Sequence, residues 1–218
     1  MKTIIIKTSL LLTLLASGNL SFAASESFQQ EWQGTVVYSA FRTMGSGVPL
    51  SPCHVLTNVH VVRGSNFAKV SISGKLRRAT VVATDESNDM ALLKVANCPI
   101  EHYARLSPIA PKKGEILTSN YYKPGLNLFR HMTRSSGKLM GIQSVVTEEN
   151  RRMSSLAIDD PHPYLRASGG GVSSKHGLVS IIFGFANRPG GRKTYAVSYH
   201  ALKTFLQQNH LYSSGSTR

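Results

Sequence analysis

Three short segments, widely separated along the chain, most constrain what this sequence can fold into. Residues 56–60 end on a histidine, residues 89–94 begin with an aspartate, and residues 167–171 hold a serine followed directly by glycines. Apolar runs typical of β-strands flank the first two segments. Since distant residues can act together only if the fold joins them, we expect the fold to bring His60, Asp89 and Ser168 together.

These three residue types suit one kind of chemistry, the nucleophilic attack of a serine on an acyl group. A serine hydroxyl is a weak nucleophile and needs a base within hydrogen-bond reach, which a histidine supplies. A carboxylate holds the imidazole in one tautomer and stabilises its charged form. Backbone N–H groups stabilise the oxyanion that forms. Asp85 is an alternative carboxylate four residues before Asp89, but the apolar run that follows Asp89 favours Asp89.

The chain order histidine, aspartate, serine separates this sequence from alpha/beta hydrolases and subtilisins, whose orders differ. The order and the motifs resemble the trypsin-like serine peptidases, most closely the protease domain of the bacterial Deg (high-temperature-requirement) branch. The resemblance covers roughly residues 35–208 and rests on three matches. They are Gly45-Ser46-Gly47-Val48 with the following 55–62 run, Asp89-Met90-Ala91-Leu92-Leu93-Lys94, and Ser168-Gly169-Gly170.

The resemblance implies an all-β fold of two six-stranded antiparallel Greek-key β-barrels with a C-terminal helix. Short β-rich runs separated by turn residues every 8 to 12 residues or so agree with this fold, and they include a strand over 55–62 that would carry His60. Apolar residues at helical spacing after Ser198, a candidate N-cap, predict the helix. The expected divisions are a leader over 1–23, barrels over 24–106 and 107–212, and a disordered tail over 213–218.

The resemblance also assigns roles around the serine. The backbone N–H groups of Arg166 and Ser168 would form the oxyanion hole, although the family usually has glycine where this chain has Arg166. A side chain at this position adopts the glycine conformation only at a cost, which predicts a strained or inactive oxyanion loop. His162 falls at the expected base of the primary substrate pocket, where it could select an acidic side chain or simply pack. The expected pocket wall comprises Ile182, Phe183, Gly184 and Tyr195.

The N-terminus has the pattern of a secretory signal peptide. Lys2 and Lys7 precede an apolar core over 10–16, and small residues at Ser21 and Ala23 predict cleavage after Ala23. The apolar core is shorter than the ~20 residues that span a bilayer, so we do not expect a transmembrane anchor. The protein is therefore expected to be exported, to the periplasm or beyond.

The chain is strongly basic, with a formal net charge of +14. Such a charge predicts attraction to anionic surfaces. The basic residues are scattered rather than clustered, which argues against dedicated nucleic-acid binding. The family architecture brings Cys53 and Cys98 close enough for a disulfide, with two free thiols as the alternative, and export would permit the bond. No spacing indicates a metal site, and the expected chemistry needs no cofactor.

The sequence therefore predicts an exported serine endopeptidase that acts on polypeptides through an acyl-enzyme. One alternative is a homologue with impaired catalysis that binds an anionic surface or a protein partner. Another is an esterase that uses the same three residues. Binding that weakens with salt and proceeds without hydrolysis would favour the first alternative, and activity on esters but not on peptides would favour the second.

Overall fold

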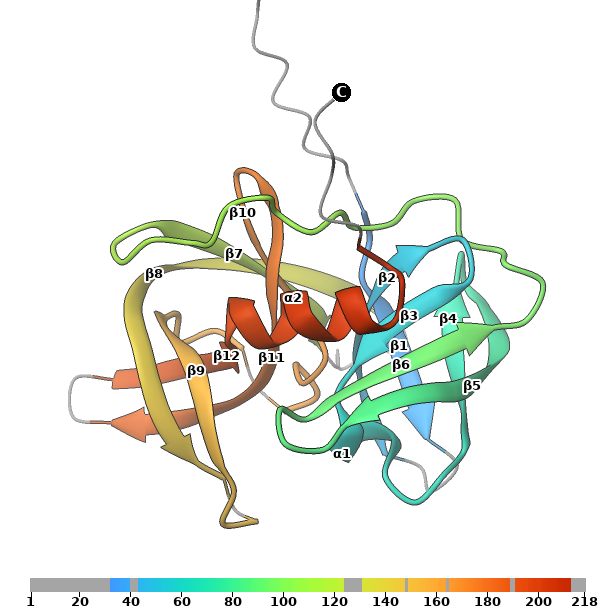
Figure 1. The fold of residues 1–218 in the computed structure, drawn as a ribbon, viewed down its shortest axis with the longest axis horizontal. Coiled ribbons are helices and arrows are strands. Elements are labelled where there is room, and N and C mark those ends of the chain that lie inside the picture. Colours follow the sequence, from blue (N-terminus) through green and yellow to red (C-terminus); the bar gives the residue numbers. More distant parts are fainter. Residues whose placement is uncertain are drawn as a thin grey trace, which may run out of the picture.

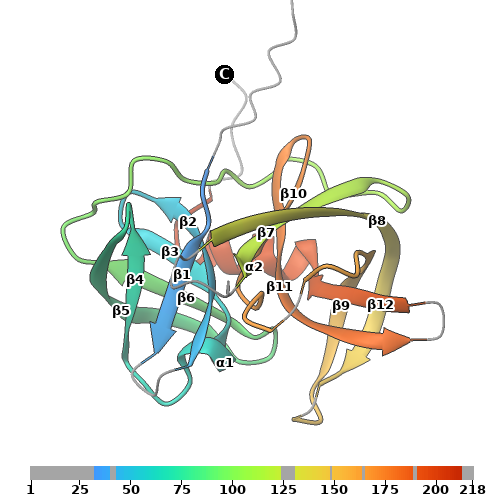
Figure 2. The same cartoon turned by 180° about the vertical axis from the view of Figure 1, so that it is seen from behind.

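The computed structural model describes residues 32–39, 43–123, 131–147, 149–163, 165–188 and 191–212. The expected leader over 1–23 and tail over 213–218 lie outside these residues. Figures 1 and 2 show two barrels side by side, with one helix lying across the boundary between them. This is the architecture that the sequence predicts.

The first barrel closes in the strand order β1-β2-β3-β6-β5-β4, with neighbouring strands antiparallel. Its core is rich in valine, a β-branched residue that packs well on a pleated surface. Exposed and buried positions alternate along β4, as the two-residue period of a strand requires. The strands are β1 (Thr35–Ser39), β2 (Met44–Ser51), β3 (His54–Thr57), β4 (Phe67–Ile72), β5 (Lys75–Asp85) and β6 (Met90–Val95).

The second barrel closes in the order β10-β11-β12-β9-β8-β7, again antiparallel throughout. Its strands β8 and β9 form a hairpin, and the described residues of its connection, 147 and 149–151, lie at the end of the hairpin near the first barrel (Figure 2). The strands are β7 (Ile116–Lys123), β8 (His131–Val146), β9 (Arg152–Asp159), β10 (Gly171–Ser174), β11 (Gly177–Arg188) and β12 (Gly191–Val197).

A third apolar cluster fills the space between the barrels beneath helix α2 (Tyr199–Gln208). The helix contributes Leu202, Phe205 and Leu206, and both barrels contribute side chains to the same cluster. The helix begins as predicted, because the Ser198 hydroxyl accepts a 3.2 Å hydrogen bond from the backbone N–H of Ala201. In the part of the chain that is described, no helix has the length and apolar character to cross a membrane.

Candidate active site

His60 lies on a one-turn helix, α1 (Val59–Val62), and not on a strand. The expectation of a continuous strand over 55–62 is therefore wrong, because β3 ends at Thr57. Contacts made after folding override the β preference of the valines here. The Asp89 carboxylate accepts a 3.0 Å hydrogen bond from the His60 N–H, one of the first-turn donors that a helix leaves unpaired.

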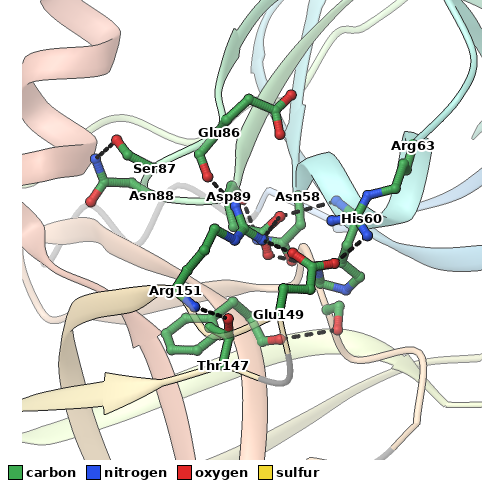
Figure 3. Close-up of polar contacts among 12 residues, drawn as sticks. Asn58, His60, Arg63, Glu86, Ser87, Asn88, Asp89, Thr147, Glu149 and Arg151 are labelled. Atoms are coloured by element: carbon green, nitrogen blue, oxygen red, sulfur yellow. Dashed lines mark hydrogen bonds and ion pairs between the residues drawn. The ribbon is translucent and has the colours of Figure 1, made fainter.

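Asp89 comes directly before β6 and orients the imidazole of His60 (Figure 3). One carboxylate oxygen, Oδ2, lies 2.6 Å from His60 Nδ1, while Oδ1 accepts the bond from the His60 N–H. The side chain of Asn58 donates a 2.8 Å hydrogen bond to the Asp89 carbonyl. Asp89 has a φ of 54° and is almost fully buried, so its carboxylate depends on these partners.

Asp85, the alternative carboxylate, serves its own turn and does not contact His60. Its two oxygens accept hydrogen bonds from the Ser87 hydroxyl and from the backbone and side-chain N–H groups of Asn88. Burial acts to raise the pKa of Asp85, but these hydrogen bonds outweigh it and the pKa is lowered. The geometry thus pairs His60 with Asp89 rather than with Asp85.

Ser168 lies in a loop of the second barrel that packs directly against strand β2 of the first. The carbonyl of Ser168 accepts a 2.7 Å hydrogen bond from the Ser46 N–H. A Cβ atom at Gly169 would lie 2.0 Å from the Ser46 carbonyl oxygen, and one at Gly171 would lie 2.4 Å from the Trp32 ring. Gly169 and Gly171 are therefore required by close packing between the barrels.

Arg166 adopts a φ of 75°, the left-handed conformation that the sequence reasoning expected the position to require. Its carbonyl accepts a 2.9 Å hydrogen bond from the Ser46 hydroxyl, which holds the loop in this conformation. The Arg166 side chain is exposed. The loop thus keeps the shape that glycine would allow, and the arginine bears the conformational cost.

The Ser168 hydroxyl does not reach its expected base in this structure. Its Oγ lies 3.5 Å from the carbonyl oxygen of Phe183, at the limit of a hydrogen bond. Among the described residues, no hydrogen bond joins Ser168 to His60. Two of the three expected catalytic groups are therefore assembled, and the third is held by a weak contact.

The expected pocket residues fall on different parts of the second barrel. His162 is exposed, and its ring Nδ1 lies 3.0 Å from Oδ1 of the buried Asp160. Ile182 packs inside the second barrel and Phe183 packs on the cluster between the barrels. Gly184 pairs with the buried Tyr195 and has open space beside its Cα. Their role in a pocket stays a prediction.

Cys53 and Cys98 form a disulfide that closes a segment of 45 residues. The bond lies beside the pairing of His54 with Lys94, at the ends of β3 and β6 opposite to Asp89.

Within the described residues, no three His, Cys, Asp or Glu side chains gather into a group that could hold a metal ion.

Sequence reasoning missed three charged residues of the site. Glu149 and Arg151, in the β8–β9 connection, reach the first barrel near His60 and Asp89 (Figure 3). Asp160 lies beneath His162 and is fully buried. The adjacent acids at 159 and 160, before a proline, were a signal for Asp160, but nothing in the sequence pairs the 147–151 turn with Asp89.

Comparison with known proteins agrees with the fold and with these motifs. The family model for the trypsin-like peptidase domain matches residues 45–180, more than half of the chain. The chain therefore belongs to the trypsin-like peptidase family. Two curated relatives, the serine proteases Rv3671c and MT3772 of Mycobacterium tuberculosis strains, are 47% identical over 55 residues. That alignment covers 25% of this chain and only 14% of each relative's length.

Solved structures resemble the whole fold at low sequence identity. The active form of the Rv3671c protease from M. tuberculosis has a TM-score of 0.70 at 20% identity, over 99% of this chain and 97% of that one. Its inactive form has a TM-score of 0.68 at 22% identity, over 82% and 89%. The MamO protease domain of Magnetospirillum magneticum has a TM-score of 0.65 at 20% identity, over 83% and 98%.

Proposed function

We propose that this protein is an exported serine endopeptidase that cleaves polypeptides through an acyl-enzyme. The observation that carries the proposal is the double contact of Asp89 with His60, one oxygen on the ring Nδ1 and the other on the backbone N–H. This arrangement fixes the imidazole so that Nε2 is the free, basic nitrogen. A general base prepared in this way has a clear use in a trypsin-like fold.

In the proposed reaction, His60 removes the proton of Ser168 as Oγ attacks the scissile carbonyl carbon. The backbone N–H groups of Ser168 and Arg166 stabilise the oxyanion, and His60 then protonates the leaving amine. Water hydrolyses the acyl-enzyme by the same steps in reverse. Before attack, Ser168 Oγ must exchange the Phe183 carbonyl for His60 Nε2. The existing contact is 3.5 Å long and weak, so this exchange costs little.

Fluorophosphonate labelling tests the proposal, because the probe reacts only with an activated serine. We expect labelling of the wild type and none of Ser168→Ala. Asp89→Asn should lose about 10⁴-fold in rate, as the loss of the orienting carboxylate does in this mechanism. Asp85→Asn is the matched control and should label normally. Folded wild-type protein that fails to label would refute the proposal, and labelled protein that cleaves esters but no peptides would be an esterase.

We further propose that the enzyme prefers an acidic residue on the acyl side of the cleaved bond. Asp160 Oδ1 lies 3.1 Å from the backbone N of His162 and 3.0 Å from its Nδ1, which directs Nε2 away from the barrel. Asp160 Oδ2 accepts a 2.6 Å hydrogen bond from Ser135, so its charge is fully engaged. In its doubly protonated form the ring also has an N–H at Nε2, and this outward N–H suits a substrate carboxylate.

A peptide library varied at that one position tests this preference. We expect glutamate or aspartate to be cleaved best, and His162→Gln to lose the preference while it still labels with the fluorophosphonate. His176→Gln alters another exposed histidine and is the control. Preference for lysine or for apolar residues would contradict this assignment of the pocket.

A binding function is the second candidate, and two observations favour it. The Ser168 hydroxyl faces Phe183 rather than His60. On the outer surface of the first barrel, Lys69 and Arg78 are exposed and stand directly opposite each other on β4 and β5, where like charges repel in the absence of an anion. Retention on anionic vesicles that falls with salt, together with no labelling, would favour this candidate.

Export is supported by the disulfide, a bond that persists mainly in oxidising compartments. Sequencing the N-terminus of the protein from the periplasm or the medium tests the proposed cleavage after Ala23. An uncleaved leader on protein retained inside the cell would contradict it.

A further inference from the structure

The connection between β8 and β9 brings charged side chains of the second barrel onto the first (Figure 3). A guanidinium N–H of Arg151 donates a hydrogen bond to the Glu86 carbonyl in the turn before Asp89. Arg151 Nη2 lies 2.6 Å from Glu149 Oε2, and the other oxygen of Glu149 pairs with Arg63. Arg63 follows α1 directly, three residues after His60. Both His60 and Asp89 thus have neighbours tied to this connection.

Arg151 also lies near the Asp89 carboxylate itself, with Nη2 4.0 Å from Oδ1. The Asp89 side chain is only 4% exposed, and a buried carboxylate needs compensation for its lost hydration. A histidine must be neutral to act as a general base, so in that role His60 orients Asp89 without supplying a charge. Among the described residues, Arg151 is the one side chain with a permanent positive charge that has a nitrogen within 4.0 Å of this carboxylate.

We propose that Arg151 is a positioning residue for the reaction, acting from the second barrel to hold the Asp89 carboxylate in place against His60. The inference rests on the proposed serine peptidase function. Ser168 also belongs to the second barrel, so the docking that brings the nucleophile to the site also completes the surroundings of the base.

The turn that presents Arg151 is built to hold it still. Thr147 N–H donates to the Arg151 carbonyl at 2.8 Å, and Thr147 Oγ1 accepts from the Arg151 N–H at 3.2 Å. The side chain is only 25% exposed, which restricts its rotamers. A planar guanidinium can contact the Glu86 carbonyl, Glu149 and Asp89 together, whereas a lysine ammonium is a single point charge.

The positive charge of Arg151 has two opposed effects on the reaction. It stabilises the Asp89 carboxylate, and it opposes the positive charge that His60 gains in the transition state. Glu149, 2.6 Å from the same guanidinium, reduces both effects. Because Asp89 Oδ1 faces Arg151 while Oδ2 contacts the His60 ring, we expect the first effect to be the larger.

The test measures fluorophosphonate labelling rates of Arg151→Met, Arg151→Lys and the matched control Arg152→Ala, whose side chain is exposed on β9. We expect Arg151→Met to label about five- to tenfold more slowly, the kinetic equivalent of one partly exposed ion pair. Arg151→Lys should recover part of the loss and Arg152→Ala should match the wild type. A purely structural role would make the lysine and methionine variants equal, and a faster methionine variant would reverse the argument.

A second readout does not depend on catalysis. In ¹⁵N-histidine-labelled protein, the Nδ1 proton of His60 reports the hydrogen bond to Asp89, and His60→Ala assigns the resonance. We expect the resonance to broaden or move upfield in Arg151→Met while the variant stays folded, and to be unchanged in Arg152→Ala. A resonance that is the same in both variants would overturn the proposal. Wild type that shows this resonance but does not label would instead refute the peptidase function alone.

Discussion

The hydroxyl of Ser46, on strand β2 of the first barrel, donates a 2.9 Å hydrogen bond to the carbonyl of Arg166 in the loop of Ser168. The same hydroxyl accepts a 2.8 Å bond from the backbone N–H of Tyr122, and the Ser46 N–H donates to the Ser168 carbonyl. One fully buried residue of the first barrel therefore contacts the nucleophile loop at two points. The shape of that loop depends on how the barrels dock.

Replacing Ser46 with alanine should weaken both folding and labelling. The change leaves the buried Tyr122 N–H without its partner, which costs about 1–3 kcal/mol in the free energy of unfolding. It also frees the Arg166 carbonyl, so the labelling rate should fall. Urea unfolding and labelling measure the two effects, with Ser154→Ala, an exposed serine on β9, as the control. A Ser46→Ala variant as stable as the wild type would contradict the role given to this hydroxyl.

Replacing Arg166 with glycine should stabilise the protein. A side chain in the left-handed conformation costs about 1–2 kcal/mol, which glycine avoids, although the greater freedom of glycine in the unfolded chain returns part of the gain. We expect a net gain of about 1 kcal/mol and labelling at least as fast as in the wild type. Arg166→Ala keeps the Cβ and should show no gain. Equal stabilities of the glycine and alanine variants would show that the backbone at this position is not strained.

Removing the disulfide should destabilise the fold without changing the site. A loop of this length, with 45 residues between its ends, predicts about 4 kcal/mol from the entropy of the unfolded chain. Since the bond lies at the ends of β3 and β6 opposite to Asp89, the folded fraction of Cys53→Ala/Cys98→Ala should label at the wild-type rate. Urea unfolding with and without reductant measures the loss, and a slower labelling rate in fully folded variant would contradict the separation.

His54 should make the protein less stable in mild acid. Burial and the nearby charge of Lys94 lower its pKa below the ordinary 6.5. The unfolded chain then binds a proton more readily than the folded one, so stability falls as the pH drops through 6.5 toward the lowered value. Above that pH window, His54 does not contribute to the pH dependence of folding stability.

Comparison of unfolding at pH 7.5 and pH 5 tests this expectation. His54→Gln should lose less stability over that interval than the wild type, and His176→Gln, at an exposed position, should behave as the wild type. An equal loss in the wild type and in His54→Gln would exclude His54 as the cause.

Most strands and the helix could be predicted because their signals are local, and the family resemblance supplied the two barrels. Valine-rich runs, turn residues at short intervals and the serine N-cap each act within a few residues, and the structure confirms α2 and the strands other than the 58–62 part of the expected 55–62 strand. Helix α1 escaped prediction because its stability comes from Asp89, which lies 29 residues further along the chain. A run of valines viewed alone favours a strand.

The site was predictable in its chemistry and not in its surroundings. The order of His60, Asp89 and Ser168 pointed to one mechanism, and the structure joins the first two. Arg151 and Glu149 were hidden because a charged hairpin connection is usually solvent-exposed, and only the docking of two barrels brings this one to Asp89. The left-handed conformation of Arg166 was expected because family resemblance identified a position that usually holds glycine.

The close packing of Gly169 and Gly171 against the first barrel has a consequence for how such a protein can change over time. A methyl group added at Gly169 would meet the backbone carbonyl of Ser46, and one added at Gly171 would meet the Trp32 ring, so neither position can gain a side chain unless the barrels shift. The contact between the barrels therefore fixes the distance between the base and the nucleophile. New specificities must then arise in the outer loops, which can vary without moving it.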